Sequence, residues 1–128
     1  MKLCISAVEN SLDAQLDPRF GRCPYFVIVD SEIMHFEAVL NMASGAMSGV
    51  GIQAAQTIAS KGVKVLITSS IGPNAFQVLS SAGVKVATGA SGKVRGVVEK
   101  YEKGELKEGN GPTVGGHFGV GGRRGRGR

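Results

Sequence analysis

Apolar and polar positions divide the first hundred residues into alternating strand-like and helix-like segments. Strand patterns fall at residues 2–8, 25–30 and 33–40, and the last two are separated by a turn of two residues. So short a connection predicts an antiparallel hairpin. The run 63–67 is apolar except at one position, which is typical of a parallel strand covered on both faces, and a further strand is expected at 84–87.

Helical patterns alternate with the later strands. We expect helices at about 52–61, from Gly72-Pro73 to the residue before Gly83, and at about 92–103. Pro73 suits the first turn of a helix, and the last segment has apolar residues at the i, i+3, i+4, i+7 spacing of an amphipathic helix. The order of these elements predicts an α/β fold, with a mixed sheet and helices on both faces.

The charge distribution separates the body of the chain from its end. The chain has 128 residues, 20 of them Gly, and a formal net charge of +5. Residues 1–103 carry ten Lys or Arg against eight Asp or Glu, whereas residues 104–128 carry five against two. Large apolar residues are scarce after residue 103. We therefore predict one domain over 1–103 and a flexible, basic Gly/Arg-rich tail over 104–128.

The tail ends in Gly-Gly-Arg-Arg-Gly-Arg-Gly-Arg at residues 121–128. This composition is typical of arginine-glycine segments that bind RNA through charge and stacking. It also suits an anionic metal species, an acidic partner protein, or a purely solubilising role. A nucleic-acid or acidic-partner binding module acting through the tail is therefore the alternative function.

Cysteine usage and the start of the chain bear on its compartment. Two cysteines, and no apolar leader behind a basic start, predict a reduced cytoplasmic setting. No apolar run is long enough to cross a bilayer, so no membrane partner is expected. Cys4 falls inside the first strand and is expected to be a small core residue.

Candidate chemistry is concentrated in the stretch 17–30. Prolines on both sides of a glycine predict a rigid loop that presents Arg19, Arg22 and Cys23. Neighbouring cations would lower the pKa of the Cys23 thiol and favour the thiolate that binds metals. Because no Cys-x-x-Cys spacing exists, cluster ligation by Cys23 would need a second subunit, exogenous thiols or histidine. A half-buried structural cysteine is the alternative.

Two glycine-containing helix starts are candidate anion sites. Gly49-x-Gly51 and Gly72-Pro73-Asn74 offer backbone N–H groups without helical partners, together with the positive ends of two helix dipoles. The alternative is that these glycines let helix and sheet pack closely. Residues 49–54 also fit a dinucleotide fingerprint, but no acidic residue ends the strand that follows.

Four stretches together resemble the dinitrogenase iron-molybdenum cofactor biosynthesis family: 2–8, 19–26, 49–55 and 70–76. The resemblance covers residues 1 to about 103. It implies a ribonuclease H-like three-layer fold, with a five-stranded mixed sheet in the order 3-2-1-4-5 flanked by three helices. It also implies a non-enzymatic carrier or scaffold for an iron-sulfur cluster or an iron-molybdenum cofactor precursor, with recipient or assembly proteins as partners.

The chain departs from the nitrogenase-type members of this family at one position. Those members carry His immediately before the Phe-Gly of the loop, where this chain has Arg19. Arginine cannot ligate iron, but its donors can pair with an anionic cluster. The first strand contains no acid, so the clustered carboxylates of a ribonuclease H-type nuclease are missing.

The strand order that the resemblance implies brings the loops after residues 8 and 67 to one place. We expect one site there, with residues 44–51 as a lid and Cys23 as the metal ligand. The predicted site residues are Arg19, Arg22, Cys23, Gly49, Gly51, Ser69, Ser70 and Asn74.

Overall fold

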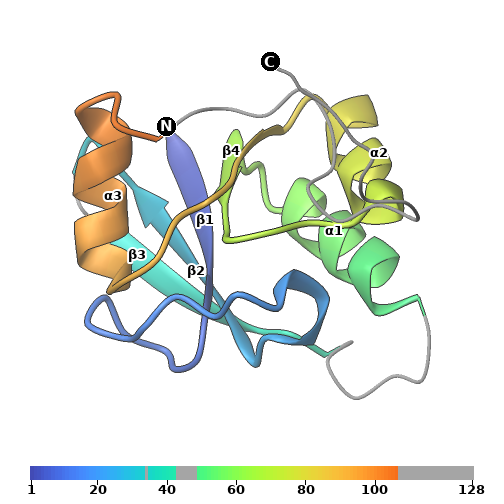
Figure 1. Ribbon diagram of the computed structural model, residues 1–128, viewed down its shortest axis with the longest axis horizontal. Helices are drawn as coiled ribbons and strands as arrows, with labels where there is room; N and C mark the ends of the chain where they lie inside the picture. Colours follow the sequence, from blue (N-terminus) through green and yellow to red (C-terminus); the bar gives the residue numbers. More distant parts are fainter. Residues whose placement is uncertain (34, 43–48, 107–128) are drawn as a thin grey trace.

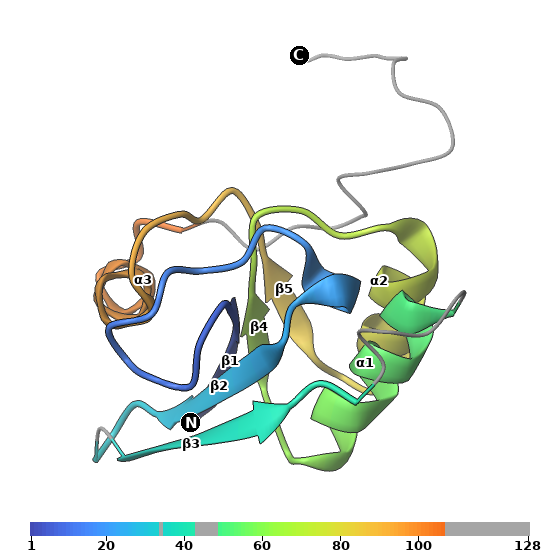
Figure 2. The same ribbon diagram turned by 90° about the horizontal axis from the view of Figure 1, so that it is seen from below.

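The computed structural model describes residues 1–33, 35–42 and 49–106. They form a five-stranded sheet between two layers of helices (Figures 1 and 2). The elements are β1 (Lys2–Ala7), the short 3-10 helix η1 (Phe20–Arg22), β2 (Tyr25–Asp30), β3 (His35–Leu40), α1 (Val50–Ser60), β4 (Val65–Ile67), α2 (Pro73–Ser81), β5 (Lys85–Ala87) and α3 (Val94–Glu102).

The sheet is mixed and has the order β3-β2-β1-β4-β5. Central β1 pairs antiparallel with β2 and parallel with β4, while β2 pairs antiparallel with β3 and β4 parallel with β5. The predicted α/β class, strand order and three helices are confirmed. Because β1 and β4 are parallel, their carboxyl ends meet at one edge of the sheet, where the pairing direction also changes.

Each face of the sheet carries its own apolar core. Leu3 and Ile5 of β1 face α3, whereas Cys4 faces the side covered by α1 and α2 (Figure 2). This alternation follows from the two-residue period of a strand, and it leaves both faces of β1 buried. Cys4 is fully buried, so its predicted place in the core is confirmed.

Several predicted boundaries are wrong by one or two residues. The strand expected from residue 63 begins at Val65, because the ladder between β1 and β4 spans only the three residues from Leu3 to Ile5. The helix expected from residue 52 begins at Val50 and ends at Ser60. Helix η1 was not predicted, since a single turn of three residues shows no period in the sequence.

Beyond α3, Leu106 packs against the core on the α3 side, so the described chain continues past the predicted boundary at residue 103. The rest of the tail lies outside the described residues, and with it the part of the chain predicted to bind RNA or an acidic partner. Residues 44–48 of the predicted lid, which spans 44–51, lie outside them too. Among the described helices, none has the length and apolar character needed to cross a membrane.

Candidate functional site

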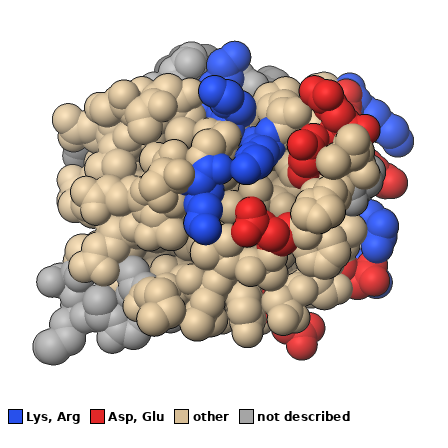
Figure 3. Space-filling view, turned by 180° about the vertical axis from the view of Figure 1, so that it is seen from behind, with Lys and Arg blue, Asp and Glu red and all other residues tan. Residues whose placement is uncertain are grey.

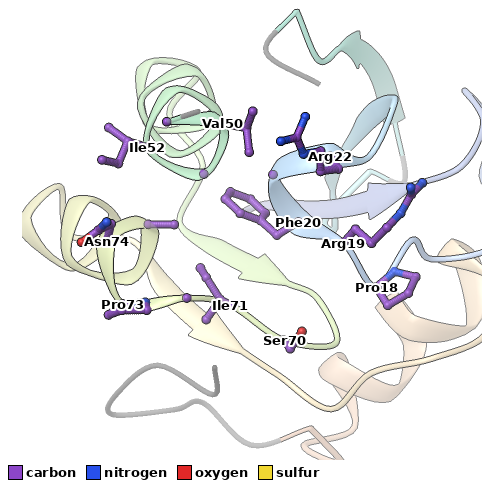
Figure 4. Close-up of a pocket in the computed structure, with 15 residues that line it drawn as sticks. Pro18, Arg19, Phe20, Arg22, Val50, Ile52, Ser70, Ile71, Pro73 and Asn74 are labelled. Carbon is purple, nitrogen blue, oxygen red and sulfur yellow. The ribbon is translucent and has the colours of Figure 1, made fainter. Parts of the chain in front are cut away.

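Three segments surround a cavity of about 390 Å³ beside the carboxyl ends of β1 and β4. One wall is the loop that contains η1, the second is the start of α1, and the third is the segment leading into α2 (Figure 4). The lining residues are Pro18, Arg19, Phe20, Gly21, Arg22, Gly49, Val50, Gly51, Ile52, Ser70, Ile71, Gly72, Pro73, Asn74 and Ala75.

A backbone bridge joins the first wall to the third. Arg19 and Ser70 form a parallel β-bridge that extends the pairing of β1 with β4. Behind it, the buried Ser6 hydroxyl donates a hydrogen bond to the Asp17 carbonyl at 2.7 Å and lies 3.0 Å from the Thr68 hydroxyl. The sheet itself therefore fixes the distance between the arginine loop and the segment before α2.

Close backbone contact joins the first wall to α1. A Cβ atom at Gly21 would lie 2.9 Å from Val50 Cγ2 and 3.0 Å from the backbone nitrogen of Gly51. A Cβ at Gly51 would in turn lie 3.4 Å from Ala75 in α2. Glycine at position 21 thus allows η1 to rest against the first turn of α1, which supports the structural interpretation of these glycines.

Asp17 fixes the position of Arg19. Its carboxylate accepts hydrogen bonds from Arg19 Nε at 3.0 Å, Arg19 Nη2 at 2.8 Å and the Arg19 backbone N–H at 2.9 Å. The Asp17 side chain is 1% exposed and that of Arg19 is 65% exposed. The hydrogen bonds from the Arg19 side chain lower the pKa of the Asp17 carboxyl, against the opposing effect of burial.

As a result, Arg19 lies at the rim of the cavity, and its guanidinium points away from both helices (Figure 4). Part of its charge is neutralised by Asp17. Arg22, the last residue of η1, lies on the side of Val50 instead. Arg22 is therefore the predicted arginine whose side chain lies nearer α1.

Asn41 holds the loop from the other side. Its Nδ2 donates hydrogen bonds to the carbonyl oxygens of Gly21, at 3.1 Å, and Cys23, at 2.8 Å. Sequence reasoning missed both Asp17 and Asn41 as supports of the site. Asp17 could have been found, because Asp-Pro-x favours a turn in which the carboxylate accepts the N–H two residues later, whereas Asn41 depends on tertiary contacts that leave no local pattern.

Cys23 is a core residue, which is closer to its interpretation as a structural cysteine than to an exposed thiolate. Its side chain is fully buried in the core on the side of α1 and α2, it is absent from the cavity lining, and its thiol donates to the Phe20 carbonyl oxygen at 3.2 Å. Burial, with a smaller contribution from the nearby Asp17 carboxylate, raises the pKa of the Cys23 thiol to about 12. The expectation that flanking cations lower this pKa is wrong, because Arg19 is engaged by Asp17 and the thiol has lost its water.

The remaining predicted residues divide into two groups. Gly49, Gly51, Ser70 and Asn74 line the cavity together with both arginines. Ser69 does not line it, since its hydroxyl turns away to donate to the Ala90 carbonyl oxygen at 2.7 Å. The described residues contain no group of three or more His, Cys, Asp or Glu side chains that could hold a metal ion.

The cavity is electropositive for reasons beyond its arginines. The first backbone N–H groups of α1 and α2 lack intrahelical acceptors, and neither helix has an acidic residue in its first turn. Phe20 and Ile71 add apolar surface between these groups. The arrangement suits an anion with a large, weakly hydrated surface, which the rim can surround without stripping tightly held water.

Comparison with known proteins places these features in a family. A family model described as dinitrogenase iron-molybdenum cofactor matches residues 1–104. The apo form of the orange protein from Desulfovibrio gigas is 40% identical, has a TM-score of 0.86, and aligns with 88% of this chain and 96% of its own. A putative NifB protein from Thermotoga is 37% identical with a TM-score of 0.73, covering 84% of this chain and 91% of its own.

Two archaeal proteins extend the comparison. An uncharacterized protein of Methanocaldococcus jannaschii is 39% identical over 75 residues, which is 56% of this chain and 60% of that relative, so the match spans less than two thirds of the relative's length. A putative dinitrogenase from the same organism is 20% identical with a TM-score of 0.67, covering 88% of this chain and 97% of its own. At that identity the likeness concerns the fold alone.

Proposed function

The chain belongs to the dinitrogenase iron-molybdenum cofactor family, and on this premise we propose that it is a non-enzymatic carrier or scaffold for an anionic metal-sulfur cargo. The cargo is an iron-sulfur cluster or an iron-molybdenum cofactor precursor. The observation that carries the proposal is the convergence of Arg22 and the N-termini of α1 and α2 on one open cavity with apolar walls.

The donors around the cavity favour binding of the cargo through its outer atoms. The lining residues include two arginines and no Asp or Glu, so an anion meets no like charge there. Backbone N–H groups and a guanidinium are hydrogen-bond donors, not metal ligands. The residues therefore fit a preassembled anionic cluster better than a bare metal ion.

Cys23 enters the proposal in a restricted role. A thiolate at this position would be a metal ligand only after the η1 loop had opened, since the closed loop keeps the thiol buried and protonated. Cys23 as a ligand stays a prediction. Capture by electrostatics in the closed form is the simpler first step, because it needs no such opening.

The cavity lining also supports a role without catalysis. Among the described residues that line the cavity, Ser70 is the one with a hydroxyl, and none is a histidine or a carboxylate that could act as a base. Within the part of the chain that the structure describes, the cavity lined by the loop and the starts of both helices (Figure 4) is not fully enclosed. We propose that this open side lets a recipient or assembly protein receive the cargo, in a reduced cytoplasmic setting.

Membership of the family also suggests a more specific fold assignment. We propose that the sheet is ribonuclease H-like, an assignment that the strand order β3-β2-β1-β4-β5 and the helical layers on both faces support.

The proposal is tested by loading the full chain anaerobically. One sample receives ferrous iron and sulfide, a second receives tetrathiomolybdate as a preformed metal-sulfur anion, and binding is followed by absorption after desalting. We expect the protein to retain a chromophore after desalting. The affinity of the protein for this cargo should fall about tenfold in Arg22→Ala, and it should fall further as the salt concentration increases. Arg95→Ala is the matched control, because Arg95 lies on α3 in an exposed ion pair with Asp13.

Two results would count against the carrier role. In the first, neither additive leaves a chromophore on the protein. In the second, a chromophore is retained equally by the parent chain, by Arg22→Ala and by Arg95→Ala, which would indicate nonspecific adsorption. Loss of binding in Cys23→Ala with retention in Arg22→Ala would replace electrostatic capture by thiolate ligation.

A further inference from the structure

Strand β3 leaves one edge of the sheet uncovered. In the part of the chain that the structure describes, β3 has β2 as its single strand neighbour. The strand is six residues long, contains no proline, and presents Phe36 and Leu40 with exposed fractions of 36% and 52%. Natural sheet edges are commonly protected by proline, lysine or a short length, and this edge has none of these.

The hydrogen-bond pattern tells which backbone groups of β3 point outward. The Asn41 N–H donates to the Pro24 carbonyl oxygen at 2.8 Å, in the same register that pairs Leu40 with Tyr25. Antiparallel pairs alternate between hydrogen-bonded and non-hydrogen-bonded positions. Counting back from Asn41, the odd-numbered residues of β3 bond to β2, and the N–H and C=O groups of Phe36, Ala38 and Leu40 point away from the sheet.

The same three residues share a face. The register places Phe36 beside Val29, Ala38 beside Val27 and Leu40 beside Tyr25, which is the face that α3 covers nearer the centre of the sheet. The charged Glu37 lies on the opposite face. The outward backbone groups and the exposed apolar side chains therefore belong to the same alternate residues.

We propose that this edge is a homodimer interface, formed by antiparallel pairing of β3 with β3 of a second copy about a twofold axis at Ala38. In this register Phe36 lies opposite Leu40 of the second copy, and Ala38 lies opposite its own equivalent. All three residues exchange hydrogen bonds through groups that already point outward. An aromatic side chain facing an aliphatic one, on each side of a small residue, is a favourable cross-strand arrangement.

Charge favours this register and a second copy as the occupant. An axis at Glu37 would pair Phe36 with Ala38 of the second copy and would place the two Glu37 carboxylates opposite each other at the close, non-hydrogen-bonded position, where like charges are destabilising. With the axis at Ala38, Glu37 faces Val39 instead. Figure 3 looks at the molecule from behind the view of Figure 1, the side on which β3 lies, and shows basic and acidic side chains next to a broad uncharged area. Glu37 is the one Lys, Arg, Asp or Glu among the six residues of β3, so pairing about Ala38 brings no two formal charges opposite each other.

The interface is small, so we expect weak self-association of the full chain at roughly 0.1–1 mM. Sedimentation velocity from about 10 µM to 1 mM should show a monomer-dimer equilibrium. Ala38→Pro removes an outward N–H and should weaken dimerisation about tenfold or more, while Ala38→Ser, which keeps that N–H, should not. Leu40→Lys serves as a second disrupting variant if the proline perturbs folding.

Amide hydrogen exchange tests the register itself. At high concentration the amides of Phe36, Ala38 and Leu40 should gain protection, whereas those of Glu37 and Val39 should be protected at every concentration. The proposal is overturned if the chain stays monomeric at about 1 mM, or if association persists in folded Ala38→Pro and Leu40→Lys. It is also overturned if the three outward amides are already protected in the monomer, which would assign the edge to a segment of the same chain.

Discussion

At the scale of single residues, Cys23 shows how burial can override sequence neighbours. The sequence places this thiol beside Arg22 and four residues from Arg19, which predicts a reactive thiolate. In the structure the Arg19 guanidinium pairs with Asp17, and the thiol lies in the core with a pKa raised to about 12. Tertiary packing decides which side chains of a loop face the core. The charged residues next to Cys23 in the sequence therefore do not reveal that its thiol is buried.

We predict that Cys23 is unreactive in the native protein. With a pKa of about 12, only about one thiol in ten thousand is ionised at pH 8. In a Cys4→Ala variant, which reports Cys23 alone, a dithiobis-nitrobenzoate reagent should react about a hundredfold or more slowly than with the unfolded chain. Cys23→Ala reports Cys4 in the same way. Rapid labelling of Cys23 under native conditions would contradict this and would favour the exposed, thiolate-presenting loop.

At the scale of elements, the sequence predicts the type of each element, strand or helix, more accurately than its first and last residues. Every strand and α-helix in the described part of the chain was predicted, because each lies within an apolar run or a periodic segment that leaves a pattern in the sequence. Helix η1 was not predicted, and neither were the hydrogen bonds from Asp17 and Asn41 that hold its loop in place. Asn41 directly follows β3 and donates to the carbonyls of Gly21 and Cys23 just before β2, a contact between residues 18 to 20 positions apart that no local pattern specifies.

The contact between η1 and α1 gives a prediction at this scale. Gly21→Ala should destabilise the protein by about 1–3 kcal/mol, because the new Cβ meets the Gly51 backbone, which cannot rotate away as a side chain can. It should also weaken binding of the metal-sulfur anion, since η1 and the α1 N-terminus must separate. Chemical denaturation measures the first effect and absorption of the loaded chain the second.

Gly96→Ala is the matched control for this substitution. Gly96 lies inside α3, and a Cβ there meets nothing within 4 Å. The change should therefore raise stability by roughly 0.5–1 kcal/mol through helix propensity, without an effect on binding. Equal stability changes for the two alanine variants would show that the close approach of η1 to α1 does not constrain position 21.

At the scale of the whole molecule, the site is an extension of the sheet. The bridge between Arg19 and Ser70 continues the parallel pairing of β1 with β4, and the hydroxyls of Ser6 and Thr68 meet beneath it. The sequence could place these loops together only through the strand order of the family. The Asp17 carboxylate strengthens that connection through its bonds to Arg19, and although the Asp-Pro pattern favours a turn there, the burial of the carboxylate follows only from the tertiary structure.

Asp17 should make the stability of the whole domain depend on pH. Its pKa is lowered in the folded state from an ordinary value of 3.8, chiefly by hydrogen bonds from the Arg19 side chain. The folded state therefore prefers the ionised form. The resulting stabilisation is fully present above the unfolded pKa and is lost as the pH falls through the lower, folded value.

Asp17→Asn measures this contribution. At pH 7 the variant should be less stable than the parent by about 1–3 kcal/mol, because the amide cannot accept both guanidinium bonds and the backbone N–H as a carboxylate does. As the pH falls below about 4, the unfolded parent chain binds a proton at Asp17 before the folded state does, so the two free energies of unfolding should converge as the pH falls toward the lowered pKa of the folded state. Asp13→Asn is the control, since Asp13 pairs with Arg95 in the open. A gap between parent and Asp17→Asn that is the same at pH 7 and pH 3 would mean that Asp17 acts through its shape and not through its charge.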